Sequence, residues 1–217
     1  MTESTETTAA DPVLTVVEAR VLGCLIEKAA TTPDVYPLTL NALQLACNQK
    51  SSRDPIMELE MGEVGHALHT LQEKNLARVE HGARVLRYAH TANAALNLTQ
   101  RPLAVLALLL LRGPQTQAEL HTRSERLADF PNAESVGDTL ERLIARDPAL
   151  VVRIGRSSGQ REDRYAHLLA GPVSVDNLPG RPIERSRANA ANLESRVEAL
   201  EQAVAELRQM LEARAQP

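Results

Sequence analysis

The chain has 217 residues and a formal net charge of −4; apolar residues make up 43% of it and aromatic residues only 2%. This length and apolar share suit one or two compact domains. The shortage of aromatic side chains argues against an enzyme for bulky substrates and against a stacking platform for single-stranded nucleic acid. The negative charge excludes a surface that attracts nucleic acid everywhere, but it leaves room for a local basic patch.

The N-terminus and the longest apolar run bear on the location of the protein. Residues 1–11 are polar and lack the apolar stretch of a signal peptide. The longest apolar run, Leu103–Leu111, is too short to span a bilayer. We therefore expect a cytoplasmic protein with no membrane partner.

The two cysteines, Cys24 and Cys47, lie on apolar faces of expected helices, so small buried thiols are expected rather than a disulfide or a metal site.

The first half of the chain predicts three helices followed by two strands. Thr15 and Glu18 form a capping box, after which apolar residues recur at helical spacing. Prolines in residues 31–37 end that helix, and residues 48–55 form a polar loop between the next two helices. The helices are expected from Thr15, over 38–47 and over 60–74, and the strands over 76–79 and 85–89.

The second half predicts the same order. A proline opens its first helix, and a second capping box is formed by Thr116 and Glu119. The helices are expected over 102–112, from Thr116 and over 135–146, and the strands over 150–154 and 164–168.

Matching residues indicate that the two halves are a repeat. Arg87–His90 and Arg164–His167 share the sequence Arg-Tyr-Ala-His, 77 residues apart. The Val-Gly-x-x-Leu-x-x-Leu pattern from Val64 recurs from Val136, within the third helix of each half. A unit of three helices, a strand, a wing and a strand is the order of a winged helix-turn-helix, whose third helix usually enters the major groove of DNA. The fold class is thus predicted as mainly α with small antiparallel β wings, in two tandem winged-helix domains.

The C-terminal part differs from the repeat. Residues 171–189 hold three prolines and are expected to be a linker. Apolar residues then follow a heptad pattern with branched residues at a and leucine at d, which favours a parallel dimer; the alternative is an amphipathic helix docked on its own domains. The dimerisation residues are Leu193, Val197, Leu200, Val204, Leu207 and Leu211. The domains are predicted as 1–12 disordered, 13–95 and 96–170 winged helices, 171–190 linker and 191–217 coiled-coil helix.

Three motifs carry a family resemblance: LTVVEARVLGCLIEK from Leu14, TPDVYPLTLN from Thr32 and CNQKSSRDP from Cys47. On these motifs the chain resembles the YceH-like family of uncharacterised bacterial proteins, over residues 14–169. The resemblance implies a tandem pair of winged helices, in agreement with the repeat. It implies no biochemical role, since none is established for that family.

The third helices are acidic, which disfavours them as readers of DNA. Residues 63–75 hold two glutamates against one lysine, and residues 134–147 hold four carboxylates against two arginines. Carboxylates in a groove oppose binding to phosphates. We expect these to be solvated structural helices. His66 and His69 lack further ligands at metal-binding spacing, and no nucleophile elbow or phosphate loop occurs, so we expect no enzyme, no metal and no cofactor.

The expected wings and the loop 48–55 are richer in cations. Arginines beside flexible residues suit phosphate or minor-groove contacts, although a basic hairpin is also common as a solvated loop. The loop has donors for anions, while its Asp54-Pro55 pair also suits a structural turn. The candidate contact residues are Lys50, Arg53, Arg78, Arg84, Arg153, Arg156, Arg161 and Arg164.

Two functions follow as hypotheses. The first is a DNA-binding, regulator-like homodimer that contacts double-stranded DNA through its basic wings. The alternative is a protein–protein interaction scaffold, similar to the winged-helix accessory subunits of chromosome-condensing complexes. The arginine wings favour the first hypothesis, and the acidic third helices favour the second.

Overall fold

A computed structural model describes residues 14–81, 85–155 and 162–171. The described residues belong to the first of two units into which the chain divides, residues 1–173 and 174–217. The predicted coiled-coil helix, with its six dimerisation residues, lies outside the described residues. So do most of the predicted linker and the N-terminal segment.

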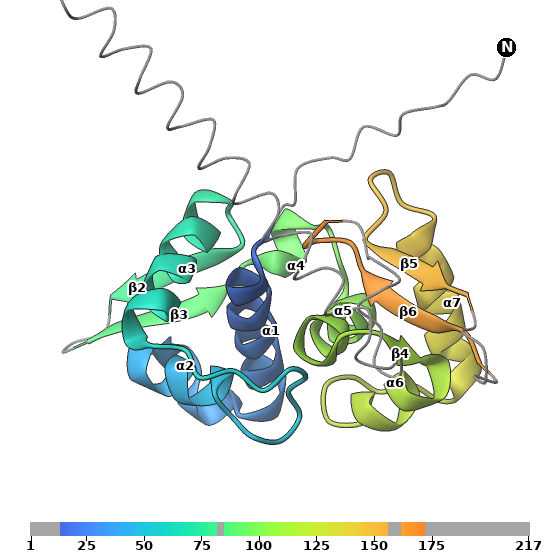
Figure 1. The fold of residues 1–217 in the computed structure, drawn as a ribbon, viewed down its shortest axis with the longest axis horizontal. Helices are drawn as coiled ribbons and strands as arrows, with labels where there is room; N and C mark the ends of the chain where they lie inside the picture. Colours follow the sequence, from blue (N-terminus) through green and yellow to red (C-terminus); the bar gives the residue numbers. More distant parts are fainter. Residues whose placement is uncertain (1–13, 82–84, 156–161, 172–217) are drawn as a thin grey trace, which may run out of the picture. The chain divides into compact units, whose positions relative to one another are not determined.

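The described chain contains helices and two small antiparallel sheets, arranged as two similar halves (Figure 1). The first half consists of α1 (Val16–Thr31), a 3-10 helix η1 (Pro33–Val35), β1 (Leu38–Thr39), α2 (Leu40–Cys47), α3 (Met61–Glu73), β2 (Ala77–His81) and β3 (Leu86–His90). The second half consists of α5 (Gln100–Arg112), β4 (Gln115–Thr116), α6 (Gln117–Ser124), α7 (Ala133–Ile144), β5 (Val151–Ile154) and β6 (Arg164–His167). The short helix α4 (Ala92–Ala95) connects them.

Each half has a three-stranded sheet in which the last strand is central. The orders are β1-β3-β2 and β4-β6-β5. Leu38 pairs with Tyr88 in the first sheet, and Gln115 pairs with Tyr165 in the second. The repeat seen in the sequence is thus also a repeat of strand pairing. The two-residue strands β1 and β4 were not predicted, and β1 explains why α2 begins at Leu40 rather than at residue 38.

The capping boxes that mark the helix starts are confirmed. The amide of Glu18 donates to Thr15 Oγ1 at 3.2 Å, and the amide of Thr15 donates to the Glu18 carboxylate at 3.0 Å. Thr116 and Glu119 make the same two bonds at the start of α6. Each box satisfies amides that have no partner within the helix, so these residues fix where α1 and α6 begin.

One hydrophobic core runs through both halves. Helices α1 and α5 pack against each other at its centre. All nine residues of Leu103–Leu111 in α5 are buried, which accounts for the longest apolar run of the sequence. The amide of Leu14 also donates to the carbonyl of Leu169, so the ends of the described region meet. The two halves therefore share one core. No helix in the described part of the chain is long and apolar enough to cross a membrane.

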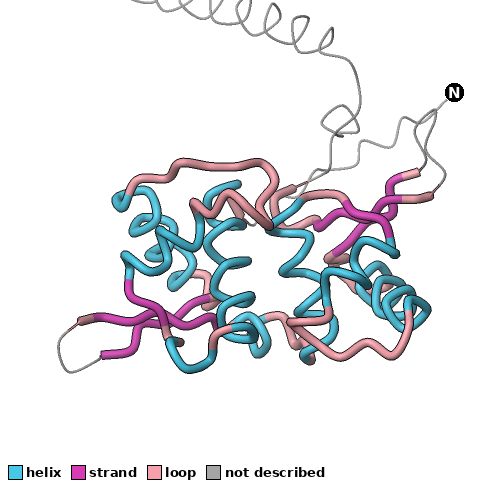
Figure 2. Tube along the Cα trace, turned by 90° about the horizontal axis from the view of Figure 1, so that it is seen from below, coloured by secondary structure: helices cyan, strands magenta, loops and turns pink. Residues whose placement is uncertain are grey.

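The β2–β3 hairpin projects beyond the helices of the first half, and the view from below shows this most clearly (Figure 2). Residues 82–84, at the turn of this hairpin, and residues 156–161, between β5 and β6, lie outside the described residues. The predicted contact residues Arg84, Arg156 and Arg161 therefore have no described position.

Candidate functional site

The loop 48–55 is fastened to the interior by Arg53. The Arg53 side chain donates to both carboxylate oxygens of Glu27, at 3.1 and 2.6 Å, and to the carbonyl of Ala46 at 3.0 Å. The residue is only 6% exposed. Its hydrogen bond to Glu27 is one reason that its pKa is raised, against the opposing effect of burial. The Arg53 side chain is thus hydrogen-bonded inside the protein.

A second buried arginine supports the same loop. Arg20 is 1% exposed and donates to the carbonyls of Cys47 and Pro55, at 3.1 and 2.5 Å. Burial lowers the pKa of Arg20. Cys24 and Cys47 lie nearby and are both buried and free, which confirms the expectation of small buried thiols. A hydrogen bond to Cys24, together with burial, raises the pKa of the Cys47 thiol.

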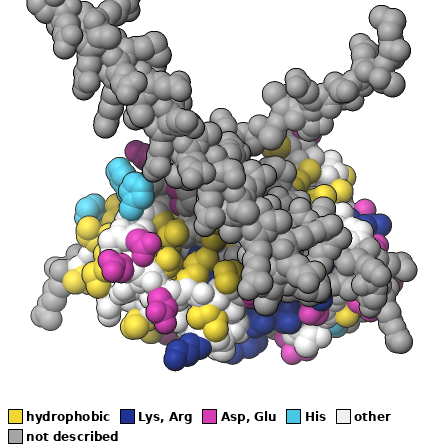
Figure 3. All heavy atoms as spheres, viewed as in Figure 1, with side chains coloured by type: hydrophobic (Ala, Val, Ile, Leu, Met, Phe, Trp, Pro, Cys, Tyr) yellow, Lys and Arg dark blue, Asp and Glu magenta, His cyan; other side chains and the backbone are white. Residues whose placement is uncertain are grey.

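Lys50 lies on the exposed side of the loop and lines a cleft between the two halves. The cleft has a volume of about 680 Å³ and is bordered by the ends of α1 and α5, by the loop and by the residues at the end of α6. We call it the basic cleft, because its lining includes the cations Lys28, Lys50, Arg112, Arg123 and Arg126. Dark-blue side chains gather along the lower edge of the molecule in this region (Figure 3).

The described arginines of the β2–β3 hairpin are already paired or anchored. Arg78 donates to the carboxylate of Glu80 at 2.6 Å, and both side chains are exposed to solvent. Arg87 donates to the carbonyl of Pro37 at 2.8 Å, which fastens β3 beside β1. Exposed ion pairs contribute little to stability, and Glu80 also reduces the positive potential that Arg78 offers to a phosphate.

The strands β5 and β6 repeat this arrangement. Arg164 donates to the carbonyl of Pro114 at 2.9 Å and to the carboxylate of Glu119 at 3.2 Å. Arg153 forms an ion pair with Glu141 of α7, and its guanidinium lies 5.7 Å from the centre of the Tyr165 ring. Arg87 and Arg164 are equivalent residues that make equivalent bonds to prolines. In both halves, the arginine of the shared Arg-Tyr-Ala-His sequence therefore anchors the central strand of the sheet to a proline carbonyl.

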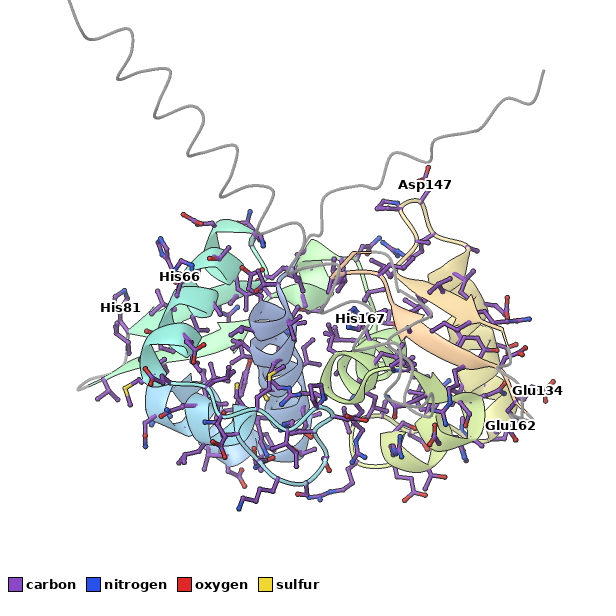
Figure 4. All side chains as sticks on the ribbon, viewed as in Figure 1. His66, His81, Glu134, Asp147, Glu162 and His167 are labelled. Carbon is purple, nitrogen blue, oxygen red and sulfur yellow. The ribbon has the colours of Figure 1, made fainter. Side chains whose placement is uncertain are left out.

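The exposed face of α3 is acidic and partly apolar. Helix α3 contains no lysine or arginine, while Glu63, His66 and Glu73 are exposed along it. Leu45 on α2, Ile56 in the segment between α2 and α3, and Met61 at the start of α3 are 63%, 58% and 46% exposed. Figure 4 shows His66 on the outer side of α3, and yellow and magenta side chains are interspersed on this half in Figure 3.

Helix α7, the equivalent of α3, is also acidic. Glu134, Asp138 and Glu141 are exposed on it against the single cation Arg142. Figure 4 shows Glu134 at the outer edge of the second half. Within the ranges that the structure describes, no three His, Cys, Asp or Glu side chains are grouped so that they could hold a metal.

Comparison with known proteins assigns the chain to a family. Residues 14–160 match the family described as "Protein of unknown function, DUF480". The chain belongs to this family of bacterial proteins. A UPF0502 protein of Xanthomonas campestris pv. campestris (strain B100) is 52% identical over 218 residues, which cover 98% of this chain and 96% of that protein. A UPF0502 protein of Mesorhizobium japonicum is 53% identical over 202 residues, covering 93% and 96%.

Proposed function

We propose that the two halves are tandem winged helix-turn-helix domains and that the protein is an interaction scaffold for a basic surface of a partner protein. We also propose that the chain is a member of the YceH-like family. The architectural support for tandem winged helices is that each half has three helices and a three-stranded sheet in the same order, with α3 and α7 in the place of the third helix.

The charge of the third helices is the observation that carries the proposal. A DNA-reading helix needs cations or neutral donors toward the phosphates and bases, and carboxylates there oppose the phosphate field. Helix α3 exposes Glu63 and Glu73 and contains no lysine or arginine. Helix α7 exposes Glu134 and Asp138 with one arginine, while its third exposed carboxylate, Glu141, is paired with Arg153. Complementary potentials favour a positively charged partner on these helices.

The exposed apolar residues indicate what else that partner carries. Leu45, Ile56 and Met61 lie in the segments that lead from α2 into α3, interleaved with the exposed carboxylates of Glu58 and Glu60. Interfaces between proteins combine an apolar centre with a polar or charged rim. The partner segment that fits is therefore amphipathic, with lysine or arginine beside apolar side chains.

DNA binding through the wings is the second candidate. It is favoured by the arginines that the sequence places at the hairpin turns, Arg84, Arg156 and Arg161, with Lys50 exposed on the loop. The described arginines Arg78 and Arg153 are paired with carboxylates. This candidate therefore depends on the three turn arginines more than on the remainder of the wings.

The test separates the two candidates on the full chain. A partner captured by the tagged protein would be purified and titrated against wild type, Glu63→Lys/Glu73→Lys and the control Asp34→Lys, an exposed carboxylate on η1. We expect the double variant alone to weaken binding by about tenfold or more.

A parallel experiment tests DNA binding. Mobility shifts with duplex DNA at low salt would compare wild type with Arg156→Ala/Arg161→Ala. Salt-sensitive DNA binding that this variant abolishes, without any direct protein partner, would overturn the scaffold and establish the second candidate.

A further inference from the structure

The basic cleft brings together cations from both halves of the protein. Lys28 and Lys50 come from α1 and from the loop of the first half. Arg112, Arg123 and Arg126 come from α5, from α6 and from the residues after α6. None of the lining residues belongs to α3 or α7, so the cleft is separate from the surface proposed above to bind a protein.

The carboxylates in the cleft leave much of this charge uncompensated. Glu27 and Glu125 are the acidic residues of the lining, against five cations, one of which, Arg123, is paired with Glu119 at 3.5 Å. Glu27 is already bound by the buried guanidinium of Arg53, at 2.6 Å, while Lys28 lies farther from it, at 3.7 Å. Lys50 and Arg126 are exposed and form no ion pair within the described ranges. A free positive potential therefore faces the cleft.

Hydrogen bonds position two of the arginines at the cleft wall. Arg112 donates to Ser52 Oγ at 2.6 Å, across the boundary between the halves, and Arg123 donates to Gln115 Oε1 at 2.7 Å. Burial and the nearby charge of Arg123 lower the pKa of Arg112. Like charges held close together are unfavourable unless an anion lies between them. An anion in the cleft would relieve this repulsion.

The size and remaining lining of the cleft indicate the kind of anion. Binding sites for small molecules usually have volumes of roughly 300–1,000 Å³, and this cleft has about 680 Å³. Leu108, Leu111 and Leu127 form only a narrow apolar floor, because each is 7% exposed or less, and Ser51 and Thr122 add hydroxyl groups. Such a lining suits a ligand that has several negative charges at one end and a less polar body at the other.

We propose that the basic cleft binds a small, multiply phosphorylated ligand of mononucleotide size, such as a nucleoside diphosphate or triphosphate. Its phosphates contact Lys50, Arg112 and Arg126, and its body lies against the leucines. Because these cations come from both halves, the bound ligand joins the loop 48–55 to α5 and α6. Because the ligand binds the folded chain, it stabilises that chain by an amount that grows with the logarithm of the ligand concentration above the Kd.

The experiment uses the full chain with ATP and with inorganic pyrophosphate as probes, at constant ionic strength. Isothermal titration calorimetry gives the affinity, and thermal unfolding gives the stabilisation. The test variant is Lys50→Glu/Arg126→Glu, since neither side chain is buried or hydrogen-bonded in the described structure. The matched control is Arg142→Glu, an exposed arginine on α7 outside the cleft.

We expect both probes to raise the melting temperature, and we expect the double variant to weaken binding by about tenfold or more while Arg142→Glu leaves it unchanged. Pyrophosphate binding without any added affinity for ATP would overturn the proposed place for the ligand body. The whole proposal fails if neither probe binds at millimolar concentration, or if Arg142→Glu weakens binding as much as the double variant. It also fails if duplex DNA binds wild type in the same cation-dependent way and more tightly than ATP does, since the cleft is then a phosphate-backbone site.

Discussion

Arg53 and Glu27 form a bidentate ion pair between the loop 48–55 and helix α1, with N–O distances of 3.1 and 2.6 Å. The Arg53 side chain is completely buried, and that of Glu27 is 14% exposed. The same loop reaches the second half, because the amide of Asp54 donates to the carbonyl of Leu111 at 2.9 Å. The loop therefore fastens the two halves together as well as bordering the basic cleft.

Replacing Arg53 tests this fastening. Arg53→Met keeps the aliphatic length but leaves the Glu27 carboxylate partly buried without its cation. Breaking one side of such a pair costs about 3–5 kcal/mol. We expect the free energy of unfolding, measured with urea at pH 7, to fall by about 3 kcal/mol. Arg126→Met, at an exposed position, is the control and should change it by less than about 0.5 kcal/mol. Equal stability of the two variants would contradict an interior role for Arg53.

Replacement by alanine should have opposite effects on stability at two glycines that lie in helices, Gly23 and Gly65. A Cβ at Gly23 in α1 would lie 2.9 Å from Leu111 Cγ and 3.1 Å from Leu110 Cβ, where α1 meets α5. Gly23→Ala should therefore destabilise the protein by about 1–3 kcal/mol through overpacking. A Cβ at Gly65 in α3 would meet nothing within 4 Å. Gly65→Ala should stabilise the protein by about 0.5–1 kcal/mol, because alanine loses less entropy in a helix. Denaturant unfolding compares them, and destabilisation by both would contradict close packing specific to Gly23.

The helices and strands could be predicted from local sequence patterns, whereas the positions of the candidate site residues depend on contacts between residues that are far apart in the sequence. The capping boxes at Thr15 and Thr116 depend on residues three positions apart, so the sequence alone indicated where those helices begin. Lys50 and Arg53 look alike in a polar loop. Only Arg53 is buried, because its partner Glu27 lies 26 residues earlier on α1.

The basic cleft was missed for the same reason. Its lining combines residues of the first half with Arg112, Arg123 and Arg126 of the second, which no single motif contains. The strands β1 and β4 were missed because two residues carry no periodicity. The sequence shows Arg87 and Arg164 as repeated residues, but the carbonyls of Pro37 and Pro114 that anchor them become their neighbours only in the folded sheets.

The heptad pattern after residue 190 predicts a homodimer. Truncation after Asn189 removes all six apolar seam positions and leaves the described region intact. We expect the full chain to have the mass of a dimer by light scattering and the truncated chain that of a monomer, since three heptads provide the pairing surface. Changing Leu200 to Asp in the full chain should have the same effect as truncation. Identical masses for the full and truncated chains would contradict the coiled coil.

His167 predicts a loss of stability on acidification. Burial lowers the pKa of this imidazole to about 4, and its Nδ1 has no hydrogen-bond partner among the described residues. In an unfolded chain the pKa of histidine is about 6.5. Between these two pKa values the unfolded chain binds a proton that the folded chain excludes, so stability is fully present above pH 6.5 and falls as the pH approaches 4. From pH 7 to pH 5 the expected loss from this residue is about 2 kcal/mol.

The neutral variant His167→Gln isolates that contribution from the titration of carboxylates. Urea unfolding at pH 7 and at pH 5 should show a smaller loss of stability for the variant than for wild type, by about 2 kcal/mol. His90 is the equivalent residue of the first half, and its pKa is also lowered, by burial and by the charge of Arg78, so part of the pH dependence should persist in the variant. His66→Gln, on the exposed face of α3, is the control and should keep the wild-type pH dependence. If wild type and His167→Gln lose the same stability between the two pH values, the imidazole of His167 is able to take up its proton in the folded protein.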